Sequence, residues 1–89
     1  MLCALLDIAI KDVKSQEDII PDGSLKDKHM QGIGRALSYL HEARSLVSRY
    51  PEADSHRESY NLVLTARIAA PRTSLAMDEL SNMMKLFAL

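Results

Sequence analysis

The stretch Ser24–Tyr50, SLKDKHMQGIGRALSYLHEARSLVSRY, contains the longest uninterrupted helical pattern in the chain. At 100° per residue, its apolar side chains fall on one broad arc. The arc consists of Leu25, His29, Ile33, Ala36, Leu37, Leu40, Ala43 and Val47, widened by Tyr39, Leu46 and Tyr50. Because this arc is too wide for one neighbour, we expect the other helices to pack around this one. Pro51 disfavours helical geometry at the preceding residue, which predicts that the helix ends near Tyr50.

Polar residues that can cap a helix mark where the helices are expected to begin. Ser24 followed by Asp27 resembles a capping box, so we expect this helix to begin near Leu25. Two later segments carry similar signals: Ser55 with Glu58, where Asp54 is a competing N-cap, and Thr73 or Ser74 after Pro71.

The remaining chain also reads as helices separated by turn residues. Pro21-Asp22-Gly23 is strong turn chemistry, and Pro71 either breaks or kinks the last helical region, of which we favour the break. The 47% content of hydrophobic residues argues against disorder, and the lack of β-branched and aromatic runs argues against a sheet. The sequence therefore predicts one all-α domain over residues 1–89, a compact antiparallel bundle with helices at about 2–18, 25–50, 55–70 and 75–88. If Pro71 only kinks the chain, the last two form one helix.

Length and composition bound the possible functions. A domain of 89 residues buries a limited fraction of its surface, so self-association would add burial, and we expect a homodimer. The single cysteine, Cys3, cannot form an internal disulfide, so we expect a cytoplasmic location by default, with a buried thiol rather than a redox sensor. No apolar run approaches the length of a membrane span. With a net charge of −1 and basic residues spread around the central helix, nucleic-acid binding is the least favoured of the classes weighed.

The terminal helix and two arginines are the candidate interaction residues. Met77, Leu80, Met84 and Phe87 share one face of the last helix, where flexible thioether side chains suit an adaptable docking surface, although core packing is the commoner use of such a stripe. Arg44 and Arg67 fall on predominantly apolar arcs. Their stems can lie over apolar surface with the charge in water, or their guanidinium groups can grip a carboxylate across an interface as specificity elements.

Arg35 and His41 form the one spacing in the chain that is typical of an enzyme family. The Arg-x5-His pattern resembles the Arg-x4-6-His element of HEPN-domain ribonucleases, and the resemblance covers these two residues alone. It implies a helical bundle that cleaves RNA with this pair at a dimer cleft. Six residues place the two side chains about 120° apart on one helix, so they would converge only with help from a second subunit.

The other polar residues have simpler interpretations. The histidines His29, His41 and His56 have no metal-ligand spacing, so we expect neither a metal nor a cofactor. His29 projects from the apolar arc as a neutral core imidazole, with a pH-dependent partner contact as the alternative. Gly32, one turn before Ala36, is expected to let another helix approach closely, whereas Gly34 lies on the more polar side.

The sequence thus favours a non-catalytic protein–protein interaction or regulatory module that acts by helix-face docking, with a second copy of itself and another protein as the expected partners. The HEPN-like ribonuclease and a nucleic-acid-binding regulator remain the two alternatives.

Overall fold

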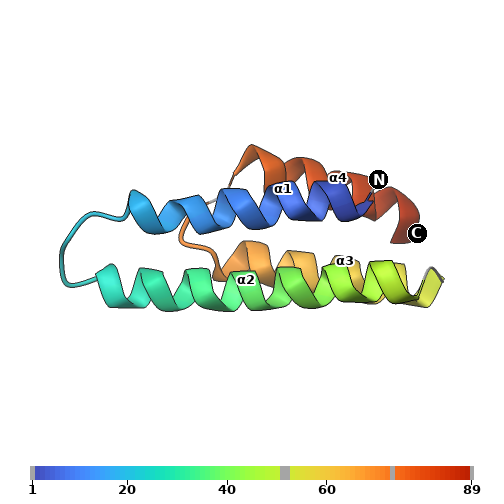
Figure 1. Cartoon of the computed structure of the whole chain (residues 1–89), viewed down its shortest axis with the longest axis horizontal. Coiled ribbons are helices and arrows are strands. Elements are labelled where there is room, and N and C mark those ends of the chain that lie inside the picture. The colour runs from blue at the N-terminus through green and yellow to red at the C-terminus, as the bar shows by residue number, and fades with distance from the viewer. Residues whose placement is uncertain (1, 51–52, 73, 89) are drawn as a thin grey trace.

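The computed structural model describes residues 2–50, 53–72 and 74–88, and the side chains of these residues apart from 53–54 and 87–88. The helices are α1 (Leu2–Ser15), the 3-10 helix η1 (Gln16–Asp18), α2 (Lys26–Arg49), α3 (Ala53–Ala69) and α4 (Leu75–Ala88) (Figure 1). No strand occurs in the described part of the chain, and the prediction of an all-α four-helix bundle is confirmed.

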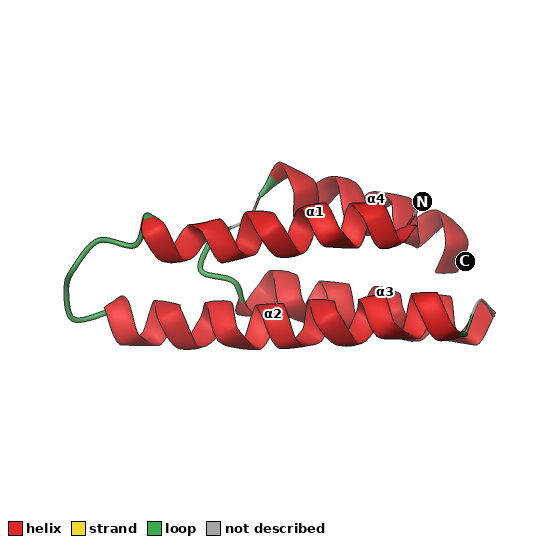
Figure 2. Ribbon diagram, viewed as in Figure 1, coloured by secondary structure: helices red, strands yellow, loops and turns green. Residues whose placement is uncertain are grey.

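Consecutive helices run antiparallel, and α4 returns alongside α1, so that the four helix axes enclose one core (Figure 2). Packing is most extensive between α2 and α3 and least extensive between α1 and α4. Within the described ranges α2 packs against α1 and α3 but not directly against α4. The expectation that all other helices surround α2 was therefore wrong, because its wide apolar arc divides between two neighbours and the bundle centre.

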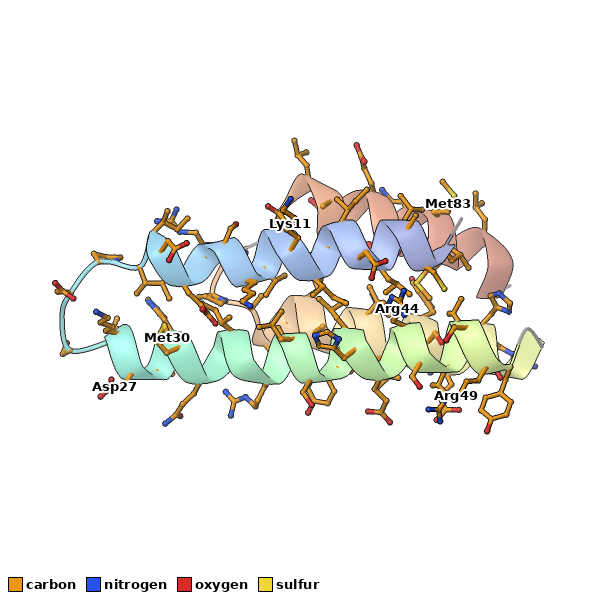
Figure 3. The ribbon with its side chains drawn as sticks, in the orientation of Figure 1. Lys11, Asp27, Met30, Arg44, Arg49 and Met83 are labelled. Carbon is orange, nitrogen blue, oxygen red and sulfur yellow. The ribbon has the colours of Figure 1, made fainter. Side chains whose placement is uncertain are left out.

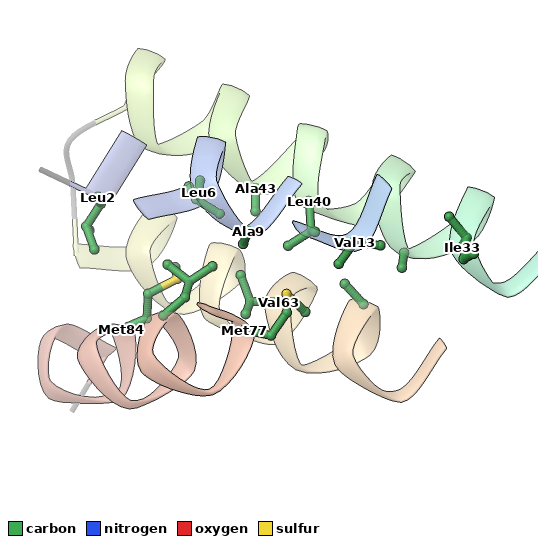
Figure 4. Close-up of a cluster of buried hydrophobic side chains, with 13 residues drawn as sticks. Leu2, Leu6, Ala9, Val13, Ile33, Leu40, Ala43, Val63, Met77 and Met84 are labelled. Atoms are coloured by element: carbon green, nitrogen blue, oxygen red, sulfur yellow. The ribbon is translucent and has the colours of Figure 1, made fainter. Parts of the chain in front are cut away.

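A single hydrophobic core runs along the axis of the bundle (Figure 4). Side chains from all four helices fill it, and the buried hydrophobic residues are Leu2, Leu6, Ala9, Val13, Ile33, Ala36, Leu40, Ala43, Val63, Ala66, Met77, Leu80 and Met84. On α1 the buried positions recur every three or four residues, which is the helical period that the sequence displays. Full burial of a leucine such as Leu6 or Leu40 contributes about 1.5–3 kcal/mol to stability.

Small residues allow α2 and α3 to lie close together. A Cβ atom added at Gly32 would stand 2.5 Å from the backbone carbonyl oxygen of Ala69, whereas one added at Gly34 would meet nothing within 4 Å. Ser59, which is fully buried on α3, donates its hydroxyl to the Ala43 carbonyl of α2 at 3.3 Å. The close helix approach predicted from Gly32 is confirmed.

The N-terminal caps agree with the sequence at one helix and differ at two. At α4 the backbone N–H of Met77 donates to Ser74 Oγ at 3.2 Å, as expected of an N-cap, while Thr73 lies outside the described residues. At α2 the N-cap is Leu25 and no side chain caps the helix. The predicted Ser24 capping box was wrong, because the Lys26 N–H bonds instead to the carbonyl of Gly23.

At α3 the predicted capping box of Ser55 and Glu58 was also wrong, and so was Asp54 as the alternative N-cap. The helix begins at Ala53, so these three residues lie inside it rather than before it. An N-cap must have non-helical backbone geometry, which residues within the helix do not have.

The helical structure is interrupted at Pro71, as favoured from the sequence, since α3 ends at Ala69 and α4 begins at Leu75. The break makes α3 shorter than α2, and the first turns of α2 extend beyond the end of α3 together with η1 and the loop of residues 19–25 (Figure 1). Leu25 is consequently 57% exposed although it falls on the apolar arc of α2. There is no α3 surface beside it to bury it.

Candidate functional site

Two apolar concavities of about 350 Å³ and about 370 Å³ lie along the pair α1 and α4. The first is lined by Leu5, Glu79, Asn82, Met83 and Leu86, and the second by Ile8, Lys11, Asp12, Ser15 and Ala76. We call this set of ten residues the α1–α4 groove. Side chains from both helices line its two parts, and Lys11 and Met83 mark its two walls in Figure 3.

The groove exists because α1 and α4 each carry apolar residues beyond their core stripe. On α1, Leu5 and Ile8 lie beside the stripe of core residues, and Ile8 is 56% exposed. On α4, Leu86 is 74% exposed, and Leu75 at the start of the helix is 80% exposed. An apolar surface shared by two adjacent helices, with charged residues at its edges, is typical of a docking surface.

Three of the four α4 residues predicted as docking residues are not on this surface. Met77, Leu80 and Met84 have exposed fractions of 1%, 0% and 1%, and they form the α4 contribution to the core. The side chain of Phe87 lies outside the described residues. These three side chains cannot contact a partner while the bundle is folded, so the outward face of α4 replaces them as the candidate surface.

Arg44 grips a carboxylate on the neighbouring helix. Its Nε donates to Asp7 Oδ1 at 2.5 Å and its Nη2 donates to Asp7 Oδ2 at 3.3 Å, which makes a bidentate contact from α2 to α1. Arg44 is labelled in Figure 3. The hydrogen bond and the charge of Asp7 raise the pKa of Arg44 above its ordinary value, with a smaller contribution from nearby Cys3. Arg44 therefore binds a carboxylate with two nitrogens, but this carboxylate belongs to the same chain and does not lie across an interface.

Arg67 forms an ion pair between α3 and α4. Its Nη2 lies 2.7 Å from Asp78 Oδ1, and both side chains are a little over one-third exposed. The contact is an ion pair by distance, since Oδ1 accepts no well-aligned hydrogen bond within the described ranges. Exposed pairs of this kind contribute about 0.2–1 kcal/mol. A role for Arg44 and Arg67 in partner recognition remains a prediction, and it would require these intrachain pairs to be shared or exchanged.

A smaller pocket of about 130 Å³ lies at the end of the bundle where α2 extends beyond α3. It is lined by Gln16, Ile20, Pro21, His29, Pro71 and Arg72. Gln16 is 5% exposed and donates from Nε2 to the carbonyl of Arg72 at 3.1 Å, which ties η1 to the α3–α4 connection. Its Oε1 accepts no hydrogen bond in the described structure and is closed off from solvent, so a molecule in the pocket would not reach it. His29 lies half-buried at the pocket rather than inside the core.

Arg35 and His41 are both exposed on α2, and neither lines the groove or the pocket described above. Their positions six residues apart on one helix direct them about 120° apart. The structure of one chain does not bring the pair together, and the ribonuclease alternative stays a prediction.

Within the described ranges no three histidine, cysteine or acidic side chains are grouped closely enough to hold a metal ion. Over the same residues, none of the helices combines the length and the apolar character that crossing a bilayer requires.

Comparisons with known proteins gave no relative. No protein-family model matches the chain. Searches of curated proteins and of solved structures likewise found no match.

Proposed function

We propose that the protein is a non-catalytic interaction or regulatory module that acts by helix-face docking and associates with a second copy of itself. The observation that carries the proposal is the α1–α4 groove, in which Leu5, Met83 and Leu86 line one concavity and Ile8 lines the other, along the same pair of helices. Helix faces of this kind bind a partner through a few apolar anchors surrounded by polar residues.

The surface area of the chain agrees with the proposal. A compact monomer of 9.9 kDa is expected to expose about 5,200 Å². This chain exposes 5705 Å², part of which follows from its elongated shape of 43 × 18 × 18 Å. Covering the α1–α4 groove would remove apolar surface from water, which favours association.

The polar residues support a docking role more than a catalytic one. Arg44 and Arg67 are engaged by Asp7 and Asp78 in contacts that hold the helices together. The groove itself holds Lys11, Asp12 and Glu79, without a histidine or cysteine that could serve as a base or nucleophile. We include a reducing compartment such as the cytoplasm in the proposal, because Cys3 is a free thiol.

The test compares two isoleucines that are both exposed but differ in their place on the surface. Ile8 lies in the groove and is 56% exposed, whereas Ile68 lies on α3, outside the groove, and is 86% exposed. We expect sedimentation equilibrium to show a dimer at micromolar concentration for the wild type and for Ile68→Glu, and a monomer for Ile8→Glu. A folded wild-type chain that is monomeric throughout this range would refute the proposed function.

A further inference from the structure

The groove carries a positive side chain on α1, Lys11, and a negative side chain on α4, Glu79, in different concavities. Leu5 shares the first concavity with Met83 and Leu86, and Lys11 shares the second with Ala76. The two helices α1 and α4 run antiparallel (Figure 1). Because residues that line one concavity lie at similar levels, these pairs place Lys11 level with Ala76 or Met77, and Glu79 level with Ile8 or Ala9. The two side chains are therefore offset along the bundle axis by two or three residues, or about 4 Å.

Lys11 and Glu79 are both exposed, and no ion pair of either occurs among the described residues. Asp7, which precedes Lys11 by one helical turn, is engaged by Arg44. The third groove charge, Asp12, is half-buried. Each wall of the groove thus presents one exposed charge without an ion-pair partner, positive on α1 and negative on α4.

We infer that a second copy of the chain occupies this groove, related by a two-fold axis parallel to the bundle, with α1 of each copy lying over α4 of the other. This inference rests on the proposed function and specifies its partner and geometry. This rotation places α1 of one copy opposite α4 of the other and leaves every residue at the same height along the bundle axis. Each Lys11 therefore lies about 4 Å along the axis from Glu79 of the partner subunit, a distance that a lysine side chain spans. The same rotation sets Ile8 and Leu86 of each copy against the apolar surface of the other.

The other two-fold arrangement conflicts with the charges. An axis that crosses the helices at the middle of the groove would place α4 against α4 of the second copy. Glu79 lines the first concavity at the end nearer that middle, so the two copies of Glu79 would meet each other. Like charges brought together at an interface oppose association, whereas the parallel axis pairs opposite charges twice.

The size of the groove sets the expected affinity. A helix of 14 residues is about 21 Å long, and the bundle is 18 Å wide, so the face covers a footprint of about 380 Å². Stable interfaces bury about 800 Å² on each partner, and smaller ones are transient. We therefore expect a dissociation constant in the micromolar range, with dimer and monomer both present in dilute solution.

Reversing the two charges separately and together tests this geometry. In Lys11→Glu and in Glu79→Lys, both reciprocal contacts of a homodimer become repulsive, and we expect about tenfold weaker self-association of each variant alone. Mixing the two variants restores both attractive contacts in a heterodimer, and the double variant Lys11→Glu/Glu79→Lys restores them in a homodimer. The control is Lys14→Glu, an exposed lysine on α1 that does not line the groove, which is expected to dimerise like the wild type.

Dissociation constants from sedimentation equilibrium distinguish the outcomes, with helix content from circular dichroism as the check on folding. Recovery in the mixture and in the double variant supports the parallel two-fold arrangement. If the wild type dimerises and Ile8→Glu abolishes the dimer, but the charge variants all behave like the wild type, this geometry is wrong and the proposed function stands. If the wild type does not dimerise, the proposed function fails with it.

Discussion

Replacing each glycine of α2 by alanine tests how close α2 and α3 approach. Neither Gly32 nor Gly34 has a positive φ angle, so alanine is compatible with the backbone at both positions. In the interior of a helix, alanine is favoured over glycine by about 1 kcal/mol. At Gly34, where an added Cβ meets nothing within 4 Å, we expect the substitution to raise the free energy of unfolding by about that amount.

At Gly32 the same intrinsic gain is opposed by a steric conflict. The added Cβ would lie 2.5 Å from the Ala69 carbonyl oxygen, a backbone atom that can move only if α3 moves with it. Overpacking of this kind costs typically about 1–3 kcal/mol, and a conflict with backbone lies toward the upper end. The net expectation is a destabilisation of about 1–2 kcal/mol, so the two variants should differ by about 2–3 kcal/mol in opposite directions.

Urea unfolding followed by circular dichroism measures both variants against the wild type, with the midpoint and the slope fitted separately. An equal slope shows that the changes act on stability rather than on the compactness of the unfolded chain. If Gly32→Ala is stabilised as much as Gly34→Ala, α2 and α3 do not approach as closely as described, and the reasoning fails.

Three further variants or pairs test other parts of the structure. Ser74→Ala removes the hydroxyl that accepts a hydrogen bond from the Met77 N–H, and it should lower the free energy of unfolding by about 1 kcal/mol. The Ser24 side chain caps no helix, so Ser24→Ala should change the free energy of unfolding by less than about 0.5 kcal/mol in the same urea assay. Met84→Ala should cost about 2–5 kcal/mol of stability because it empties part of the core, while Leu86→Ala, at a 74% exposed position, should leave the melting temperature near that of the wild type and weaken self-association instead. Arg44→Met removes the contact with Asp7. Because this contact raises the pKa of Arg44, its contribution to the free energy of unfolding is fully present below the ordinary arginine pKa. That contribution is lost only as the pH rises through the raised pKa. The stability difference between Arg44→Met and the wild type should therefore stay constant from about pH 7 to 11, and a marked decline near neutral pH would contradict this assignment of the contact.

The sequence by itself determined the helices, because each depends on interactions close along the chain. The apolar period, the turn at Pro21-Asp22-Gly23 and the break at Pro71 predicted the bounds of α2, α3 and α4 to within two residues. The predicted end of the first helix at residue 18 was wrong by three residues, because α1 ends at Ser15 and the chain continues as the 3-10 helix η1. The Ser74 cap belongs to the same class, since its hydroxyl bonds a backbone N–H three residues away. The Ser24 cap was predicted on the same principle and was wrong, because the Lys26 N–H donates to the Gly23 carbonyl instead.

Only the tertiary structure decided which apolar face of a helix is buried. On α4 the stripe of Met77, Leu80 and Met84 and the groove residues Met83 and Leu86 are similar in hydrophobicity, so periodicity alone does not say which set forms the core. The neighbours α1 and α3 select the first set and leave the second in the groove.

The partners of charged residues were likewise decided by tertiary packing. Arg44 and Asp7 are 37 residues apart in the chain, and their contact exists only because α1 and α2 lie side by side. Local rules act within about one helical turn, so they locate helices and caps. Long-range packing determines which surface remains uncovered, and in this protein that surface is the α1–α4 groove.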